Sequence, residues 1–288
     1  MLLSEVELQQ MRVVAETGAQ AAGQSALSYL RQSKPLQIEV KGPQDFVTAV
    51  DKEVEWLLRR RLQDSFSDHA ILGEEFGLDR EGASVVWVLD PIDGTSNFMR
   101  DRPGWCVSVG AMVDQQPVLG VIYDPVKDEL YSAVTGMGAT RNGEPIFVNR
   151  EATLGKAVFG VGFTSGKSVE AHAQQISHIL NNGCEYRRFG SSAMMLAHVA
   201  DGRLDGYADG LTCIWDVLAG LVLVREAGGT IEDFTASGAE RGAILAAAPW
   251  AAEMIGYLLE IDRKALPGLA ENPGETARSL NAFKKTVP

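Results

Sequence analysis

The sequence predicts a layered fold of the α+β or α/β class, in which helices pack against sheets. A long helical pattern opens the chain, short apolar runs alternate with turn signals from Cys106 to Val148, and strands then alternate with helices. This change of rhythm predicts a division near residue 150. We expect an N-terminal α+β half over 1–150, a C-terminal α/β half over 151–262, and a loosely ordered extension over 263–288.

In the first half, Ser4 and Glu7 have the spacing of a capping box, which predicts a helix from there to about Arg31. The segment Lys41–Phe46 is rich in turn residues, and Asp51 can cap a second helix. From residue 106 to 148, apolar runs at 107–113, 118–123 and 129–134 indicate an antiparallel meander.

In the second half, strands are predicted at 157–161, 204–207 and 243–247, with helices at 168–181, 191–201 and 214–227. Gly162–Ser168 resembles a phosphate-binding loop, but three residues separate its glycines where four are required. We therefore interpret it as a loop that leads into the helix at 168.

Composition limits the possible partners and compartment. The 288 residues are 45% hydrophobic and 22% charged, and the net charge of −12 argues against a nucleic-acid-binding surface. Three cysteines without metal-type spacing suggest reduced thiols. No apolar run approaches the ~20 residues that span a bilayer, and no signal peptide is recognisable. These features predict a cytoplasmic protein without a nucleic-acid or membrane partner.

The segment Trp87–Phe98 is the most informative about function. An apolar run, Val85–Leu89, predicts a buried strand that ends at Asp90; Asp93 follows, and then a Gly-Thr-Ser turn. Two carboxylates, a hydroxyl and free backbone N–H groups at one point are what a site for Mg²⁺ and phosphate needs.

Further acids occur where other elements meet polar turns. Glu74 follows the apolar run 70–72, Asp216 opens the helix at 214–227, and Asp51 begins the second helix. Each alone is typical of a turn or a cap, and Glu75 is interpreted as a partner of Glu74 or a solvated acid. Together they predict a site for two or three Mg²⁺ ions.

Five ordered elements resemble the inositol monophosphatase family, which comprises lithium-sensitive, Mg²⁺-dependent phosphatases of the superfamily that includes fructose-1,6-bisphosphatase. The motif W-x-x-D-P-x-D-G-T-x-N-F is matched by Trp87–Phe98, and W-D-x-x-x-G by Trp215–Gly220. The other elements are Gly73–Glu75, Asp45–Asp51 and Gly190–Ala193. The resemblance implies an α-β-α-β-α sandwich, a homodimer and inhibition by Li⁺.

The resemblance also implies the metal ligands. Glu74, Asp90 and the main-chain carbonyl of Ile92 are expected to hold the first Mg²⁺. Asp90, Asp93 and Asp216 are expected to hold the second, and Glu74 with waters a weaker third.

For catalysis, the resemblance implies that Thr95, paired with Asp51 and close to Glu74, orients the metal-bound water. The backbone N–H groups of Gly94 and Thr95 are expected to receive the phosphate. Because a cation lowers the pKa of its bound water, this chemistry needs no histidine base. Aspartyl-phosphate and cysteine phosphatases are excluded, since the D-x-D and C-x₅-R patterns are absent.

The alcohol part of the substrate is expected to meet Asp93, Asp216, Asp209 and the segment Gly190, Ser191, Ser192 and Ala193. Inositol-preferring members typically have Glu where this chain has Asp209. Three hypotheses remain open. The first is hydrolysis of a small polyol phosphate, with inositol 1-phosphate leading. The second is the same chemistry on histidinol phosphate, whose amine Asp209 would face, or on a 3′-phosphoadenosine nucleotide. The third is a non-catalytic regulatory member.

Overall fold

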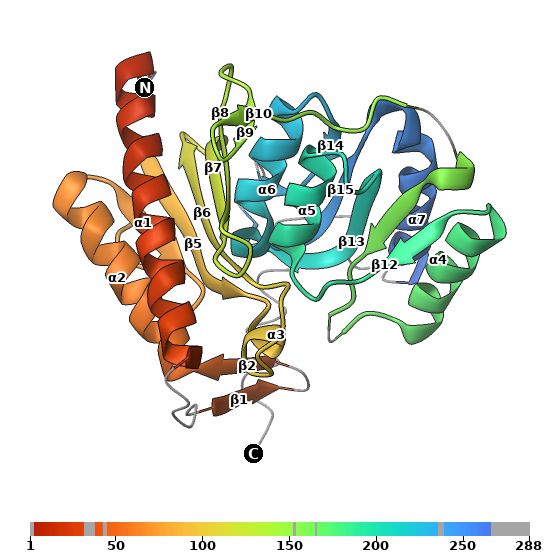
Figure 1. The fold of residues 1–288 in the computed structure, drawn as a ribbon, viewed down its shortest axis with the longest axis horizontal. Helices are drawn as coiled ribbons and strands as arrows, with labels where there is room; N and C mark the ends of the chain where they lie inside the picture. The colour runs from red at the N-terminus through yellow and green to blue at the C-terminus, as the bar shows by residue number, and fades with distance from the viewer. Residues whose placement is uncertain are drawn as a thin grey trace.

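Five layers, α-β-α-β-α, make up the fold of the computed structural model (Figure 1). The structure describes residues 3–31, 38–42, 45–151, 154–164, 166–235 and 239–265, with backbone alone for 38–42 and 45–47. Two helices cover one face of the first sheet, two lie between the sheets, and two cover the second sheet. The layered α/β class predicted from the sequence is thereby confirmed.

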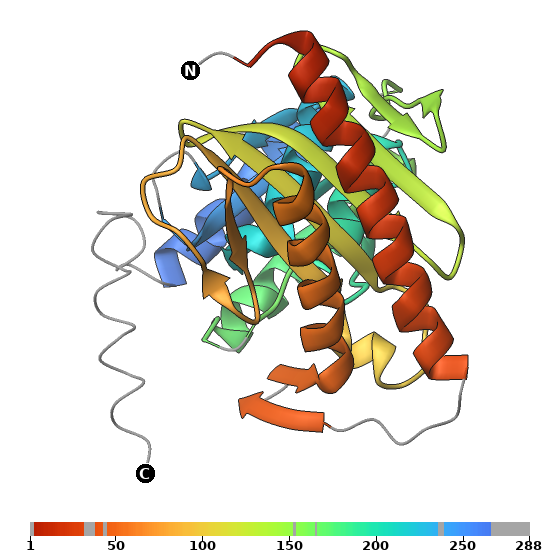
Figure 2. The ribbon, with the colours of Figure 1, turned by 90° about the vertical axis from the view of Figure 1, so that its left-hand side faces the viewer.

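The first sheet has eight strands in the order β10-β9-β8-β7-β6-β5-β3-β4. Their bounds are β3 Ala70–Gly73, β4 Gly77–Leu78, β5 Val85–Asp93, β6 Cys106–Val113, β7 Gln116–Asp124, β8 Glu129–Val134, β9 Ala139–Arg141 and β10 Glu144–Pro145. Strands β6 to β10 form the predicted antiparallel meander. Strand β5 pairs antiparallel with β6 and parallel with β3. Helices α1 (Glu5–Arg31) and α2 (Ala49–Ser65) cover the outer face (Figure 2).

Both N-terminal helices begin with capping boxes. The Ser4 backbone N–H donates to Glu7 at 2.7 Å and the Glu7 N–H donates back to the Ser4 hydroxyl at 3.3 Å, as predicted. The expectation that Asp51 is the capping residue of α2 is wrong, because Asp51 occupies the N3 position of a capping box. Thr48 is the N-cap, and Asp51 is the N3 residue that accepts the Thr48 N–H at 2.9 Å. Thr48 has the extended backbone of an N-cap, and its hydroxyl accepts the Val50 N–H at 3.2 Å.

The second sheet has five strands in the order β12-β11-β13-β15-β14. Their bounds are β11 Val158–Val161, β12 Glu185–Arg187, β13 Gly206–Cys213, β14 Thr230–Glu232 and β15 Arg241–Ala247. Helices α5 (Ser192–Ala200) and α6 (Ile214–Glu226) lie between the sheets, and α4 (Val169–Asn181) and α7 (Ala252–Ala265) cover the far face.

The helix α6 lies against the first sheet at very short range. A Cβ at Gly120 of β7 would lie 2.1 Å from the carbonyl oxygen of Ala219, and one at Gly110 of β6 would lie 2.7 Å from the Leu218 side chain. Glycine on both strands therefore lets α6 approach, and the buried apolar residues of α6, Val217 among them, join the core between the sheets.

Several elements differ from the expected ones. The strand predicted at 204–207 is β13, which runs to Cys213 and therefore contains Asp209. The segment Lys41–Phe46 is not only a loop, since its ends belong to the antiparallel strands β1 (Ile38–Gly42) and β2 (Asp45–Thr48). The boundary expected at residue 262 falls inside α7, which ends at Ala265; residues 266–288 lie outside the described part.

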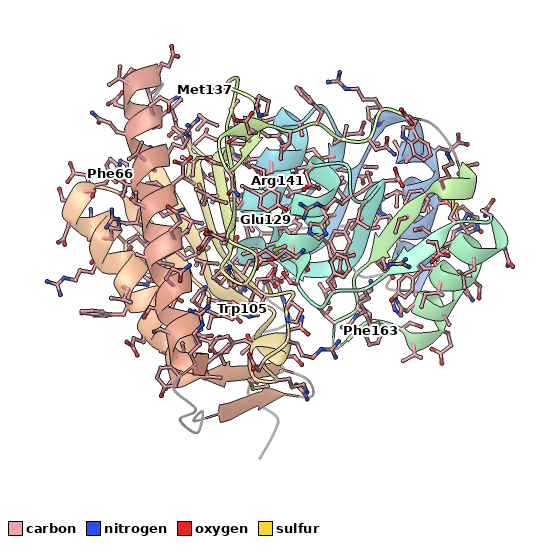
Figure 3. All side chains as sticks on the ribbon, in the orientation of Figure 1. Phe66, Trp105, Glu129, Met137, Arg141 and Phe163 are labelled. Carbon is pink, nitrogen blue, oxygen red and sulfur yellow. The ribbon has the colours of Figure 1, made fainter. Side chains whose placement is uncertain are left out.

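Ion pairs join the middle layer to the first sheet. Arg141 of β9 contacts Asp201 at 2.7 Å, and Arg203 contacts Glu129 of β8 at 2.6 Å, so the turn after α5 is held by two strands (Figure 3). None of the described helices is long and apolar enough to cross a membrane.

Candidate metal centre

The parallel pairing of β3 and β5 brings two acids to the same sheet edge. Gly73, the last residue of β3, pairs with Leu89 of β5. The next residue along each chain segment is an acid, Glu74 after β3 and Asp90 within β5. The backbone N–H of Glu74 donates to the Leu89 carbonyl at 3.1 Å, which continues the register by one residue. The two carboxylates lie close enough that the charge of Glu74 raises the pKa of Asp90.

Asp90 and Asp93 are separated by an irregularity in the β5–β6 pairing. The Asp90 carboxylate accepts the backbone N–H of Ile92 at 3.0 Å. This hydrogen bond spans Pro91, where the regular pairing of β5 with β6 is interrupted. Asp93 is held from the middle layer, where Ser191 Oγ and the Ala193 backbone N–H each donate to its Oδ2 at 2.6 Å.

Asp216 completes a cluster with these two acids. It lies in the first turn of α6, and its Oδ2 accepts the Thr212 hydroxyl at 3.0 Å and the Cys213 N–H at 3.2 Å. One oxygen each of Asp90, Asp93 and Asp216 lie within 4.8 Å of one another. The structure thus brings together three acids from separated segments, as the sequence predicts.

The electrostatics of this cluster follow from burial and like charge. Burial raises the pKa of Asp93 to about 7, and the Asp216 carboxylate adds to the rise. Burial also raises the pKa of Asp216 to about 6, against the hydrogen bonds from Cys213 and Thr212. The pKa of Asp90 is raised well above its usual value, first by burial and then by its acidic neighbours.

Such a cluster fits divalent cations of the Mg²⁺ type. Its donors are carboxylate oxygens, which Mg²⁺ prefers, and their mutual repulsion is a cost that a cation would relieve. Asp90, Asp93 and Asp216 would hold the ion, with Glu74 beside Asp90.

Thr95 and Asp51 lie beside the acids. The Thr95 hydroxyl is 3.4 Å from Asp51 Oδ1 and 3.1 Å from the Ile92 carbonyl oxygen. Gly94 precedes the short helix α3 (Thr95–Phe98) with φ +99°, and a Cβ there would lie 2.8 Å from the Gly104 carbonyl oxygen. Only glycine suits this position, since it needs both a left-handed conformation and a close backbone approach.

Glu55 of α2 is a buried acid at the site that the sequence did not single out. It accepts the Glu75 N–H at 2.8 Å and the Arg59 guanidinium at 2.7 Å, directly beneath Gly73. The sequence contains no clear indication that Glu55 is buried, because an acid four residues before an arginine on a helix is typical of a solvated ion pair.

Asp209 is buried, and its partner is a lysine of this chain. Lys167 Nζ lies 3.3 Å from Asp209 Oδ1 and 2.9 Å from Asp262 Oδ2 of α7. The sequence interpretation missed Lys167 and Asp262, since a lysine in a glycine-containing turn and an acid near a chain end both suggest solvated surface. The side chain of Lys41, in the turn-rich segment Lys41–Phe46, lies outside the described part.

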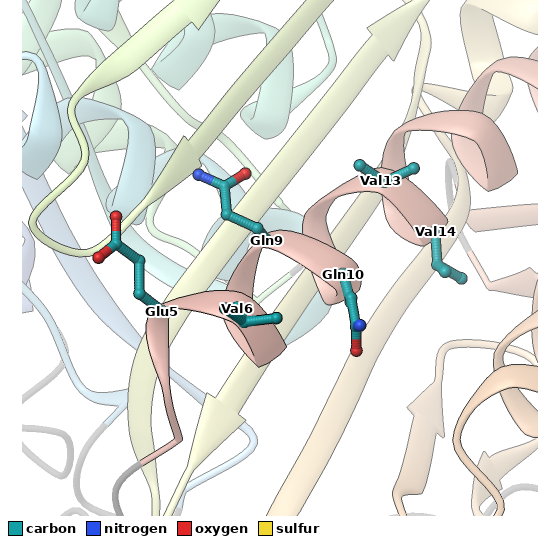
Figure 4. Close-up of a pocket in the computed structure, with 6 residues that line it drawn as sticks. All are labelled: Glu5, Val6, Gln9, Gln10, Val13 and Val14. Atoms are coloured by element: carbon teal, nitrogen blue, oxygen red, sulfur yellow. The ribbon is translucent and has the colours of Figure 1, made fainter.

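Two other features lie apart from the acids. Cys106, Cys184 and Cys213 are all free and buried. An open hollow lies on the exposed side of α1 and contains none of the predicted site residues (Figure 4). It is lined by Glu5, Val6, Gln9, Gln10, Val13 and Val14.

Comparison with known proteins agrees with this geometry. A model of the inositol monophosphatase family matches residues 7–263. The chain belongs to the inositol monophosphatase family. Among relatives, Nus factor SuhB of Xylella fastidiosa is 37% identical over 225 residues, 77% of this chain and 82% of that protein. Inositol-1-monophosphatase of Synechocystis is 37% identical over 240 residues, 82% of this chain and 83% of that protein.

Solved structures of inositol monophosphatase family members have the same architecture. The extragenic suppressor protein suhB of Bartonella henselae has a TM-score of 0.81 at 29% identity, covering 87% of this chain and 98% of that one. Inositol monophosphatase of Anabaena has a TM-score of 0.74 at 32% identity, covering 88% and 96%.

Proposed function

We propose that the protein is a Mg²⁺-dependent phosphomonoesterase that hydrolyses a small polyol phosphate, with inositol 1-phosphate as the leading substrate. The observation that carries the proposal is the convergence of Asp90, Asp93 and Asp216 in a chain of this family. Bound Mg²⁺ would supply Lewis-acid activation of water and of the phosphate. Li⁺ is proposed as an inhibitor, a homodimer as the assembly, and the cytoplasm as the compartment.

The chain's own groups support a direct attack by water. Asp51 accepts from the Thr48 backbone N–H, so its other oxygen stays directed toward the Thr95 hydroxyl. When Thr95 donates to Asp51 or Ile92, its oxygen lone pairs are free to accept a hydrogen bond from water and so to orient it. The N–H groups of Gly94 and Thr95 are proposed to receive the phosphoryl oxygens.

The environment of Asp209 favours a neutral alcohol over an amine. An amine of histidinol phosphate would need a carboxylate without its own counter-ion, whereas Asp209 already contacts the Lys167 ammonium at 3.3 Å. We therefore place histidinol phosphate behind a polyol phosphate, and assign Asp209 an indirect role on the substrate side. A 3′-phosphoadenosine nucleotide stays an alternative.

Phosphate release tests the proposal directly. We expect the purified protein to release phosphate from inositol 1-phosphate with Mg²⁺, and to stop when EDTA removes the metal. Asp93→Asn is expected to lower kcat at least ~100-fold, because it removes charge where the cation would bind. The matched control is Asp64→Asn, on the exposed side of α2. Mg²⁺-dependent release that survives Asp93→Asn would exclude this mechanism.

The substrate is tested by comparing kcat/KM for inositol 1-phosphate, histidinol phosphate and 3′-phosphoadenosine 5′-phosphate. The highest value for inositol 1-phosphate is expected. Turnover of histidinol phosphate alone would reject the leading substrate without rejecting the metal chemistry.

A second candidate is a binding or regulatory role. It is favoured by relatives from Xylella fastidiosa and Escherichia coli that are named Nus factor SuhB, a name that does not describe a hydrolase. Failure to hydrolyse any of the three phosphates with Mg²⁺ present would favour this role over catalysis.

A further inference from the structure

A buried lysine, Lys167, belongs to a chain of polar side chains that begins with Asp262 on α7. Lys167 has a side chain that is 0% exposed, and its ammonium donates to the Gly162 carbonyl oxygen at 2.8 Å and to Asp209 at 3.3 Å. It also contacts Asp262 at 2.9 Å. Two carboxylates and one carbonyl oxygen therefore surround the single positive charge of Lys167.

From Asp209 the chain continues to Tyr207 and Ser192. The Tyr207 hydroxyl donates to Asp209 Oδ2 at 3.2 Å, and the Ser192 and Tyr207 hydroxyl oxygens are 2.9 Å apart. An ionised carboxylate accepts only, so the one proton of Tyr207 is used on Asp209. Ser192 must then donate to Tyr207, which leaves the lone pairs of the Ser192 oxygen as acceptors.

Ser192 is the member of this chain of groups that solvent reaches. Lys167, Asp209 and Tyr207 are buried, whereas Ser192 is partly exposed. Its neighbours Ser191 and Ala193 both donate to Asp93. The Ser192 hydroxyl therefore lies at the edge of the acid cluster, where the alcohol part of a substrate would lie.

The close approach of Asp209 and Tyr207 to the backbone requires a glycine at position 162. A Cβ at Gly162 would lie 1.7 Å from Asp209 Oδ2 and 2.7 Å from the Tyr207 hydroxyl oxygen. The bare backbone at 162 thus lets Lys167, Asp209 and Tyr207 meet.

We propose that Lys167 is a positioning residue for substrate specificity. By holding Asp209 it fixes the Tyr207 proton, and so sets Ser192 as a hydrogen-bond acceptor for a hydroxyl group of the substrate alcohol. This inference rests on the proposed phosphatase function. It predicts that a preferred substrate has a hydroxyl group that donates to Ser192. It also predicts that Lys167, which does not contact the substrate, determines this preference.

The test compares inositol 1-phosphate with cyclohexyl phosphate, which has the same ring size and no ring hydroxyls. Ser192→Ala, Tyr207→Phe and Lys167→Met are each expected to raise KM for inositol 1-phosphate about five- to tenfold, the value of one hydrogen bond. KM for cyclohexyl phosphate is expected to change by less than about twofold in Lys167→Met and Tyr207→Phe, because no hydroxyl is lost.

Two controls separate positioning from a general structural effect. Lys264→Met removes an exposed lysine from α7 and is expected to change neither KM. The double variant Lys167→Met with Ser192→Ala is expected to be no worse than either single variant, since both break one chain of groups. If Lys167→Met fails to fold, Tyr207→Phe gives the same test with the ion pairs intact.

The outcomes are distinct. An equal loss on both substrates in Tyr207→Phe or folded Lys167→Met overturns the inference, as does no effect on inositol 1-phosphate. A wild type without preference for inositol 1-phosphate overturns it while leaving the phosphatase proposal in place. A wild type that hydrolyses neither substrate overturns both the inference and the proposed polyol phosphate substrate. Release of phosphate from histidinol phosphate or 3′-phosphoadenosine 5′-phosphate would then still support the metal chemistry.

Discussion

The Glu55 carboxylate accepts the backbone N–H of Glu75 at 2.8 Å, and so holds the loop that carries Glu74 from below. The same carboxylate accepts the Phe76 N–H at 3.3 Å and the Arg59 guanidinium at 2.7 Å. Three donors converge on one buried acid, which fixes the loop without itself joining the acid cluster. The position of a proposed metal ligand thus depends on a residue of α2.

We predict that Glu55→Gln weakens metal dependence more than it changes the reaction itself. The amide offers one acceptor oxygen where the carboxylate has two, and its NH₂ would face backbone donors. The Mg²⁺ concentration for half-maximal activity should rise about tenfold, the size typical for outer partners of metal ligands. Glu53→Gln, on the exposed side of the same helix, is the control. An unchanged Mg²⁺ requirement would contradict the role given to Glu55.

Gly120→Ala should destabilise the fold through the contact between β7 and α6. The new methyl would lie 2.1 Å from the Ala219 carbonyl oxygen, so helix or strand must move. We expect a loss of about 2–4 kcal/mol in the free energy of unfolding, measured by urea denaturation. Gly155→Ala is the matched control, because a Cβ there meets nothing within 4 Å. Equal stability of the two variants would refute the close packing.

Asp90→Asn should make the metal-free protein more stable while it removes activity. Asp90 is buried, and the charges of Glu74, Asp93 and Asp216 all disfavour its ionised form. Removing that charge relieves repulsion, so we expect Tm without metal to rise by a few degrees. The further rise that Mg²⁺ gives the wild type should be lost. A lower Tm in the metal-free variant would show that the repulsion is already compensated.

The stability of the fold should fall in mild acid because of His198 on α5. Burial lowers the pKa of His198 to about 4, and the Arg203 guanidinium beside it also opposes a second positive charge. In the unfolded chain the value is about 6.5, so stability is full above that pH and decreases as the pH falls from about 6.5 to about 4.

The size of this effect is measurable at two pH values. Between pH 7.5 and about pH 5 the linkage of one histidine amounts to about 2 kcal/mol in the free energy of unfolding. His198→Gln should lose less stability over this range than the wild type, by roughly that amount. His178→Gln, on α4, should behave like the wild type. Parallel pH profiles for wild type and His198→Gln would contradict the assignment.

The elements with strong periodicity were predictable from the sequence, and so was the acid cluster. Asp90, Asp93 and Asp216 lie at the ends of apolar strand or helix patterns, where local signals are clear. Lys167 was not predictable, because its burial depends on Asp209 and Asp262, which are distant in sequence. The strands β12 and β14 have three residues each, too few to show a period. Their formation depends on pairing with β11 and β15.

The division of the acid cluster between two parts of the chain has a consequence for biosynthesis. Asp90 and Asp93 belong to the first sheet, whereas Asp216 opens a helix of the middle layer. A growing polypeptide exposes the first two acids long before the third leaves the ribosome. Strand β15, which pairs with β13 just before Asp216, is made later still. The acid cluster is therefore incomplete until α6 and β15 have been synthesised, and a nascent chain that stops before α6 lacks Asp216.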